Sequence, residues 1–316
     1  MPPTLDEMPD SVAAEVEALK VAAASHLPGK RPKNLLVGTW NLRAFGNVTA
    51  KWNATSGDSP KRDWRAVALV GALVGHFDVV ALQEVRRDTT ALRLVLSMLG
   101  DKWQAVVSDV TEGDEGNDER LAFLYDSTRV RPSGLVGEIV LPSVAGNPSR
   151  QFARSPYAAS FVRHDVEFIL TTVHILWGKA AKDRIPELTA FAKWMFQWAS
   201  RTSDWNENLL VLGDFNVDRN DSPLYKALSA SGLFPPSQLN GIPRTIFDDE
   251  KSKHFYDQIA WFTDLANMNS LLTGMRYQGV AGSFDFLPFA FKNLPKDQVS
   301  WRISDHYPLW VEFQID

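Results

Sequence analysis

The clearest feature of the sequence is a short apolar run that ends in closely spaced polar residues. Residues 209–212 are Leu-Leu-Val-Leu, too few for a membrane span but suited to a strand buried on both faces. Gly213 ends the run, and Asp214 and Asn216 follow on either side of Phe215. Because alternate side chains of an extended backbone share a face, we expect Asp214 and Asn216 to point together from the end of a core strand. The alternative for this segment alone is a polar turn, where Asp and Asn are common.

The same pattern recurs at four other places along the chain. Apolar runs stand beside polar residues that can bind a metal or move a proton: Asn41, Glu84, His174, Asp305 and His306. One such coincidence carries little information, whereas five in one chain indicate that several strand ends contribute to a single site.

Apolar residues at helical spacing predict an outer layer of helices. The predicted helices cover residues 10–24, 64–74, 86–99, 184–201 and 224–231. Residues 27–33 contain two prolines and a glycine, which is typical of a connector into the first strand. Because no linker divides the strand-rich remainder, we expect an N-terminal helix and connector over residues 1–33 and a single domain over residues 34–316.

Hairpin signatures add a second kind of connection between strands. The predicted strand pairs are residues 103–108 with 121–125 and residues 155–162 with 167–173. A further short strand is expected over residues 259–262, two positions after Asp257. Hairpins mixed with β-α-β stretches predict an α/β fold of two packed sheets with helices outside them.

The composition excludes several kinds of chemistry. The 316 residues include no cysteine, so disulfides, thiol catalysis and thiolate metal sites are absent. The net charge of −5 means that a polyanion needs a local basic patch or a bound cation to approach. Neither a signal peptide nor an apolar stretch long enough to cross a membrane is visible. We expect a cytoplasmic protein that binds no membrane, with secretion through a removed leader as the alternative.

Oxygen ligands dominate the polar residues beside the predicted strands: Asn41, Glu84, His174, Asp214, Asn216, Asp257, Asp305 and His306. Carboxylate and amide oxygens favour a hard cation, Mg²⁺ or Mn²⁺, with Ca²⁺ as an alternative structural or co-activating ion. A zinc or iron site of two histidines and one carboxylate is the alternative, although neither His-x-His nor His-Glu-x-x-His occurs. We expect Glu84 and Asp305 to bind the ion directly, with Asn41 at or next to it.

Histidines beside a hard-cation site are better explained as groups that transfer protons or contact phosphate. Water must lose a proton before it attacks phosphorus, and the pentacovalent species that follows carries extra negative charge. A carboxylate such as Asp214 or Asp257 beside an imidazole raises the pKa of the imidazole and fixes its orientation. Taken singly, His174 or His306 is typical of a structural histidine, but the whole set favours catalysis.

Several segments occur in an order that is typical of one superfamily. They are Thr39-Trp40-Asn41, Leu82-Gln83-Glu84-Val85, Val173-His174, Gly213-Asp214-Phe215-Asn216, Tyr256-Asp257-Gln258-Ile259 and Ser304-Asp305-His306-Tyr307-Pro308. This order resembles the endonuclease/exonuclease/phosphatase superfamily. Within it, the deoxyribonuclease-I-like nucleases are most similar, through Gln83-Glu84-Val85-Arg86, Glu119-Arg120-Leu121-Ala122-Phe123-Leu124 and Phe152-Ala153-Arg154-Ser155-Pro156. The resemblance covers residues 35–313 and implies a four-layered α/β/β/α sandwich, two packed mixed sheets flanked by helices, that hydrolyses phosphodiesters with a divalent metal.

The resemblance also implies a role for each site residue. It implies that Glu84, Asn41 and Asp305 hold the metal, that Arg154 contacts a phosphate and that Arg86 lies at a nucleic-acid groove. The catalytic residues that it implies are His174 with its carboxylate partner Glu119, His306 with its partner Asp257, and Asp214 and Asn216, which orient the water or the phosphate.

One stretch departs from the nuclease pattern. Residues 115–118 are acidic and lack the aromatic side chain that the resemblance places in the DNA minor groove. Like charges facing phosphates oppose duplex binding, and Lys61, Arg62 and the phenylalanine-rich residues 279–297 are candidates to compensate. Burial of those phenylalanines against the sheet is the favoured alternative to stacking on bases.

The leading hypothesis is a metal-dependent DNA endonuclease that hydrolyses the phosphodiester backbone with an activated water and acts as a monomer. A second hypothesis keeps this chemistry and changes the substrate to a phosphoinositide, a sphingomyelin-like lipid or a small phosphodiester. A third is a binding module that has lost catalysis, which the complete set of catalytic positions argues against.

Overall fold

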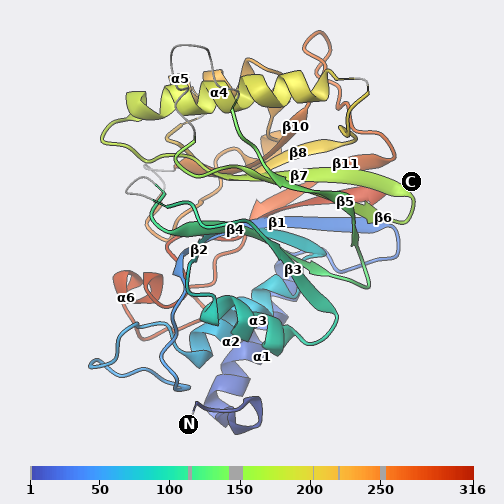
Figure 1. Cartoon of the computed structure of the whole chain (residues 1–316). Coiled ribbons are helices and arrows are strands. Elements are labelled where there is room, and N and C mark those ends of the chain that lie inside the picture. The colour runs from blue at the N-terminus through green and yellow to red at the C-terminus, as the bar shows by residue number, and fades with distance from the viewer. Residues whose placement is uncertain (1, 113–115, 142–151, 202, 220, 250–253) are drawn as a thin grey trace.

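The computed structural model describes residues 2–112, 116–141, 152–201, 203–219, 221–249 and 254–316. Two six-stranded sheets pack face to face, and helices cover the outer face of each (Figure 1). Each sheet contains both parallel and antiparallel pairs of strands. The chain therefore has the α/β/β/α sandwich of two mixed sheets that the sequence predicted.

The first sheet has the strand order β11-β12-β1-β2-β4-β3. Its strands are β1 (Asn34–Phe45), β2 (Val79–Arg86), β3 (Trp103–Val107), β4 (Glu119–Asp126), β11 (Met275–Ser283) and β12 (Leu309–Ile315). Of these, β1 and β2 run parallel. The helices on its outer face are α1 (Asp10–His26), α2 (Trp64–Val74) and α3 (Thr90–Leu99), with the short η1 (Leu5–Glu7) before α1.

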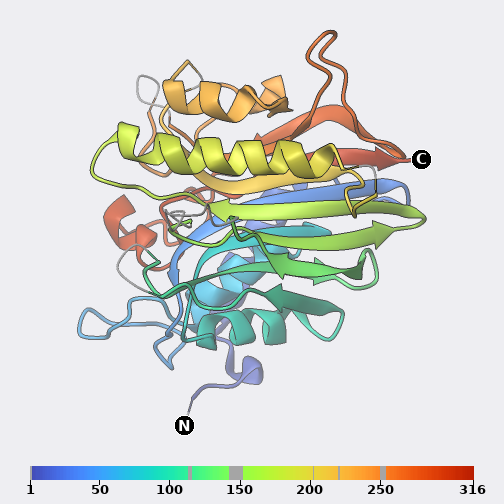
Figure 2. The same ribbon diagram turned by 45° about the horizontal axis from the view of Figure 1, so that its top comes forward.

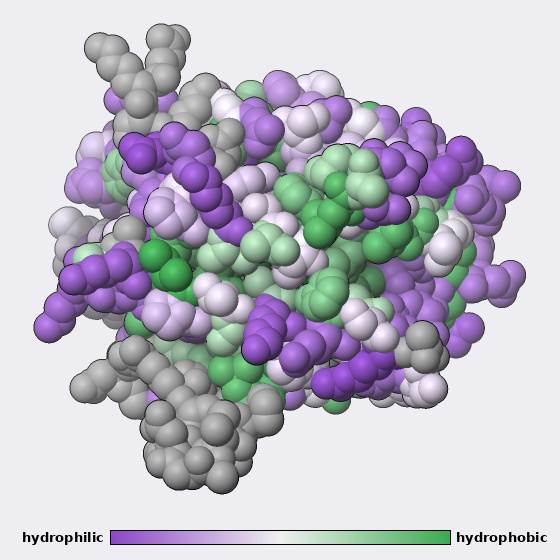
Figure 3. All heavy atoms as spheres, turned by 90° about the horizontal axis from the view of Figure 1, so that it is seen from above, coloured by the Kyte–Doolittle hydropathy of each residue, from purple (hydrophilic) through white to green (hydrophobic). Residues whose placement is uncertain are grey.

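The second sheet has the strand order β5-β6-β7-β8-β10-β9. Its strands are β5 (Arg131–Glu138), β6 (Tyr157–Arg163), β7 (Val166–His174), β8 (Leu209–Val217), β9 (Leu233–Phe234) and β10 (Phe255–Phe262). Here β7 and β8 form the parallel pair. Helices α4 (Ala181–Ala199) and α5 (Pro223–Ser229) cover this sheet, and α4 lies along it in Figure 2. Figure 3 looks onto this side of the molecule, where apolar and hydrophilic residues are intermixed.

The central strand β8 is buried on both faces, as its uninterrupted apolar run predicted. Leu210 and Leu212 belong to the hydrophobic layer between the two sheets. Leu209 and Val211 face the opposite way and pack in the cluster that contains α4 and α5. This alternation with a period of two is what a strand between two apolar layers requires.

Helix boundaries differ from the predicted ones mainly beside the strands. The helix predicted over residues 86–99 begins only at Thr90, because β2 continues through Arg86. The phenylalanine-rich stretch is not all loop, since β11 runs to Ser283 and the short α6 (Lys296–Ser300) begins within its last residues. Its aromatics Phe284 and Phe286 are buried in the cluster under α1 and α2. Packing in the core, and not contact with a ligand, therefore explains these two phenylalanines.

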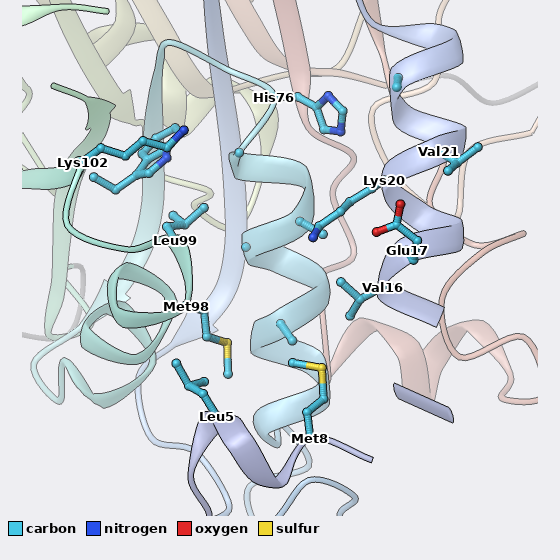
Figure 4. A pocket seen from close by; sticks show the side chains of 16 residues that line it. Leu5, Met8, Val16, Glu17, Lys20, Val21, His76, Met98, Leu99 and Lys102 are labelled. Carbon is cyan, nitrogen blue, oxygen red and sulfur yellow. The ribbon is translucent and has the colours of Figure 1, made fainter. Parts of the chain in front are cut away.

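An apolar groove of about 690 Å³ lies among α1, α2 and α3. Figure 4 shows Met8, Val16, Met98 and Leu99 around it, with the ammonium of Lys20 nearby. The groove belongs to the outer helical layer and not to the strand ends. None of the helices in the described ranges combines the length and the apolar character that crossing a bilayer requires.

Candidate active site

The ends of the two parallel strand pairs meet at one end of the sandwich. β1 and β2 bring Asn41 and Glu84 to this end, and β7 and β8 bring His174 and Asp214. The sheets are joined here because Nδ2 of Asn41 donates a hydrogen bond of 3.1 Å to Oδ2 of Asp214. The four side chains line a cleft of about 390 Å³.

Nine of the eleven candidate residues line this cleft: Asn41, Glu84, Glu119, Arg154, His174, Asp214, Asn216, Asp305 and His306. The other two lie next to it. Asp257 is fully buried behind His306. Arg86 lies 3.8 Å from a carboxylate oxygen of Glu84 and 3.8 Å from one of Glu119. The structure thus brings together residues that are widely separated in sequence, while their individual roles stay predictions.

Glu84 is presented to the cleft by an irregularity near the end of β2. The register of β2 against β4 shifts between Leu82 and Val85, and Glu84 has a φ of 58°. This left-handed conformation costs a non-glycine residue roughly 1–2 kcal/mol, and bulges beside active sites commonly redirect a side chain. Its Oε2 accepts a hydrogen bond of 2.8 Å from the N–H of Ala44, which holds the carboxylate against the end of β1.

Strand register places Asp214 at the centre of the site. In the second sheet, Asp214 pairs with His174 of β7 on one side and with Asp257 of β10 on the other. Its Oδ2 is 3.8 Å from Nε2 of His174 and 3.9 Å from Nε2 of His306. A single buried carboxylate oxygen therefore lies between two imidazole rings.

His306 and Asp257 form a buried, charged pair. Nδ1 of His306 lies 2.6 Å from Oδ2 of Asp257. Burial alone would lower the pKa of His306, but the charges of Asp257 and Asp214 outweigh burial and raise that pKa well above its usual value. Burial raises the pKa of Asp257 to about 6, against the opposing effect of His306. The raised pKa favours the protonated, imidazolium form of His306.

His174 is held in a similar way by Glu119. Nδ1 of His174 lies 2.7 Å from Oε2 of Glu119, at the start of β4. Burial would raise the pKa of Glu119, but His174, Arg154 and Arg86 together lower it to about 2. The charged carboxylate fixes the ring so that Nε2 lies on the side of Asp214.

Arg154 supplies positive charge with unused hydrogen-bonding capacity. Its Nε lies 2.6 Å from Oε2 of Glu119, and its Nη2 donates to Oε1 at 3.3 Å. Its Nη1 is buried and has no hydrogen-bond partner among the described residues. A buried donor without a partner costs about 1–3 kcal/mol. Because Arg154 lines the cleft, its positive charge is placed to attract an anion there.

Asn216 supports Asp214 through the backbone. Its N–H donates a hydrogen bond of 2.9 Å to Oδ1 of Asp214, and its Nδ2 donates to the carbonyl of Ile175 at 2.6 Å. The residue has a φ of 50°, a conformation that asparagine tolerates better than most side chains. Asp214 and Asn216 both line the cleft, as the alternation along the strand predicted.

Glu84, Asp305 and Asn41 fit a hard divalent cation. All three line the cleft and offer oxygen atoms, which match the preference of Mg²⁺ and Mn²⁺. Oε1 of Glu84 and Oδ1 of Asp305 make no hydrogen bond within the described ranges, so each carboxylate keeps an oxygen available. The other oxygen of Asp305 lies 3.1 Å from Nη1 of Arg43, which positions the carboxylate.

A second group of metal-capable side chains is Asp214, Asp257 and His306, whose ligand atoms all lie within 4.8 Å of one another. Oδ2 of Asp257 and Nδ1 of His306 are already joined by their short hydrogen bond. Both pKa values of this pair are raised, which fits the proton-transfer role predicted for it.

The prediction that Arg62 is a candidate to compensate for the acidic residues 115–118 at a DNA surface is wrong. Its side chain is buried, and its guanidinium donates to five backbone carbonyls, those of Leu42, Arg43, Ala44, Arg302 and Ile303. Arg62 therefore joins the end of β1 to the segment before Asp305 and cannot reach a phosphate. Glu115, from the acidic stretch, lies outside the described residues.

Six further residues line the cleft without having been predicted: Asn117, Trp177, Thr245, Phe247, His254 and Tyr256. Tyr256 adjoins Asp257 and Trp177 stands three positions after His174, so closeness in sequence to a candidate was an available signal. Phe247 offered none, because it lies in the connection between β9 and β10 and only the folded path of that connection brings it to the cleft.

Similarity to known proteins agrees with this geometry. A protein named deoxyribonuclease from Thioalkalivibrio sp. (strain K90mix) is 25% identical over 300 residues, which cover 91% of this chain and 73% of the relative. Two solved structures share the fold. Mannosyl-6-phosphatase from Bacteroides thetaiotaomicron superposes with a TM-score of 0.56 at 18% identity, covering 88% of this chain and 99% of that one. D. rerio TDP2 complexed with a single-strand DNA product gives a TM-score of 0.57 at 14% identity, covering 89% and 99%.

The description "Endonuclease/Exonuclease/phosphatase family" belongs to the family model that matches residues 38–293. The match includes seven of the nine candidate residues that line the cleft and ends before Asp305 and His306. The chain belongs to the endonuclease/exonuclease/phosphatase family, whose members are hydrolases that act on phosphoester bonds.

Proposed function

We propose that this protein is a divalent-metal-dependent DNA endonuclease that cleaves the phosphodiester backbone with an activated water. The observation that carries the proposal is the position of Asp214, whose Oδ2 lies within 3.9 Å of Nε2 of both histidines. A carboxylate between two imidazoles can accept a proton on one side of a phosphate while an imidazolium donates one on the other.

The proton transfers follow from the charge of each group. Asp214 accepts the proton of the attacking water, because its oxygen lies in the cleft between the two rings. His306 holds a proton at neutral pH and donates from Nε2 to the leaving oxygen, while Asp257 compensates the positive charge of the ring. Fixing these groups in advance removes the need to reorganise them during the reaction.

The phosphate is held by positive and hydrogen-bonding groups on the other side of the cleft. Arg154, which lines the cleft and is held against Glu119, binds a non-bridging oxygen through its guanidinium. His174, oriented by Glu119, contacts a second oxygen through Nε2. Glu84, Asp305 and Asn41 are the residues that would hold Mg²⁺ or Mn²⁺, and the bound cation supplies positive charge that stabilises the developing charge on phosphorus-bound oxygens.

DNA is the favoured substrate because of two relatives. The Thioalkalivibrio protein that resembles this chain over 300 residues is named deoxyribonuclease, and the TDP2 structure that shares the fold contains a single-strand DNA product. The alternative substrate is a phosphoinositide, a sphingomyelin-like lipid or another small phosphoester, and the mannosyl-6-phosphatase shows that the fold is not confined to nucleases.

The test is a substrate panel with Mg²⁺, Mn²⁺ or a chelator. Supercoiled plasmid, linear duplex, single-stranded DNA, RNA, a phosphoinositide, sphingomyelin and a sugar phosphate are compared under the same conditions, with His306→Ala as the matched inactive control. We expect nicking or fragmentation of DNA that needs the metal and that the variant lacks. Turnover of a lipid or sugar phosphate without cleavage of any nucleic acid would contradict the proposal.

A further inference from the structure

One wall of the cleft is aromatic, although the reaction itself requires no aromatic group. Trp177, Phe247, His254 and Tyr256, together called the aromatic wall, all line the cleft that contains His174 and His306. Trp177 is 51% exposed and Phe247 is 52% exposed. Large apolar side chains that are half exposed beside polar catalytic groups are unusual for a surface that binds phosphate alone.

Trp177 is held rigidly in spite of its exposure. The guanidinium of Arg184 lies 4.1 Å from the centre of its ring, and Nε of Arg184 donates a hydrogen bond of 2.7 Å to its carbonyl. The ring of Trp177 also makes an edge contact with the ring of Tyr256, and the two ring centroids are 5.4 Å apart. A ring fixed before a ligand arrives loses little conformational freedom when the ligand stacks on it.

The aromatic wall continues to the catalytic centre. Tyr256 stacks on His254 at 4.6 Å, and its ring lies 6.1 Å from that of His306. Nδ1 of His254 is fixed by a hydrogen bond of 2.7 Å with Asp248. Tyr256 thus links Trp177 to His306 through two ring contacts, and Phe247 stands two positions after Thr245, which pairs with His306. A base resting on Trp177 or Phe247 would therefore lie near a phosphate bound at His306.

The acidic turn before β4 disfavours a second strand. Asn117 of this turn lines the cleft, and its neighbour Asp118 is exposed, as is Glu112. Arg87 pairs with both of these carboxylates, so one cation offsets two negative charges. A duplex would bring additional phosphates towards this negative surface, whereas an unpaired strand would not.

We infer that the aromatic wall is a base-stacking surface that selects an unpaired strand, so that a base next to the scissile phosphate lies on Trp177 and Phe247. The inference deepens the proposed nuclease function and rests on it. Stacking of this kind requires bases that are free of a complementary strand, since paired bases present only their edges. Truncating one stacking ring typically weakens binding about 5- to 150-fold per base.

The test compares three substrates of equal length: a single-stranded oligothymidylate, a chain of abasic tetrahydrofuran phosphates, and a duplex of the oligothymidylate. The ratio of kcat/KM for the oligothymidylate to that for the abasic chain measures the contribution of the bases. The wild-type protein should prefer the oligothymidylate over both other substrates. Trp177→Ala and Phe247→Ala should each lower the ratio at least fivefold, and Trp177→Tyr should restore much of it.

Trp205→Ala is the matched control, because Trp205 is also an exposed tryptophan but is absent from the lining of the cleft. It should retain the wild-type ratio. Cleavage of the oligothymidylate and the abasic chain at equal rates by the wild-type protein would overturn the inference while leaving the nuclease function standing. A preference of the wild-type protein for the duplex would also overturn the inference and leave the nuclease function standing. Cleavage of none of the three with Mg²⁺ or Mn²⁺ would overturn the proposed function and the inference together.

Discussion

Oδ2 of Asp257 lies 2.6 Å from Nδ1 of His306, and both side chains are buried. Asp257 comes from β10 of the second sheet, whereas His306 precedes β12 of the first. The contact therefore crosses the sandwich, and it keeps the ring charged and fixed where its other nitrogen faces the cleft. The proposed proton donor is therefore held by a contact between the two sheets.

Replacement of His306 should abolish most of the activity without unfolding the protein. General acid–base groups typically contribute about 10²–10⁴-fold to a rate, and we expect His306→Ala to lose activity in this range. His306→Asn places an amide nitrogen near the position of Nδ1, from which it can donate to Asp257, so an equal loss in this variant separates chemistry from packing. The measurements are initial rates of DNA cleavage and thermal melting curves. Activity within tenfold of wild type in both variants would refute the role of His306.

Glu84 should determine how much metal the enzyme needs. Its removal takes away one of the two carboxylates that fit the cation, so Glu84→Ala should raise the Mg²⁺ or Mn²⁺ concentration for half-maximal activity, by roughly tenfold or more. The measurement is a metal titration of the cleavage rate. Glu112→Ala is the control, because Glu112 is a strongly exposed glutamate outside the cleft lining. An unchanged requirement in Glu84→Ala would show that this ligand is misassigned.

The strand ends of the site could be predicted because they break a strong local pattern. Buried strands such as β8 are continuously apolar, so a charged residue like Asp214 at their end is conspicuous. The contacts among these residues could not be predicted from spacing alone. They depend on register between strands far apart in sequence, as in the pairing of Asp214 with Asp257.

Exposed strands and buried charges were the main features that local patterns did not identify. Most residues of β5 and β11 are exposed or half-buried, so neither strand carries an uninterrupted apolar run. Arg62 follows a lysine in a polar loop, where an exposed arginine is the normal expectation. Only the arrangement of carbonyl groups around Arg62, which comes from two distant segments, makes its burial favourable.

Glu119 should make the stability of the protein depend on pH in the acid range. Folding lowers the pKa of Glu119 from 4.5 to about 2. The folded state therefore binds fewer protons, and the stability from this group is complete above pH 4.5 and is lost as the pH falls towards 2. Glu119→Gln should be less stable near neutral pH and should lose less stability on acidification.

The measurement for Glu119 is the free energy of unfolding by urea between pH 7 and pH 2, with a chelator present. Glu112→Gln is the control because that carboxylate is largely exposed, and it should follow the wild-type curve. Parallel curves for the wild-type protein and Glu119→Gln across the acid range would show that the Glu119 carboxylate is not stabilised by its neighbours.

Arg154 should contribute to binding of the phosphate. A charge-assisted hydrogen bond contributes about 1.5–3 kcal/mol, so Arg154→Ala should lower kcat/KM for DNA roughly 10- to 100-fold. Arg154→Lys keeps the charge but not the planar group and should recover only part of the loss. Arg201→Ala is the control, since Arg201 is exposed and absent from the cleft lining. Equal effects of Arg154→Ala and Arg201→Ala would show that Arg154 contributes only general positive charge.

Arg62 should stabilise the fold and the metal site together. Arg62→Met would leave carbonyls from two segments without their donor, and because a buried polar group without a partner costs about 1–3 kcal/mol, we expect a loss of roughly 3 kcal/mol in the free energy of unfolding. The same carbonyls precede Asp305 and follow Asn41, so the metal concentration for half-maximal activity should also rise. Arg201→Met, at an exposed ion pair, should change stability by less than about 0.5 kcal/mol. A destabilised variant with an unaltered metal requirement would separate the two effects and leave Arg62 with a purely structural role.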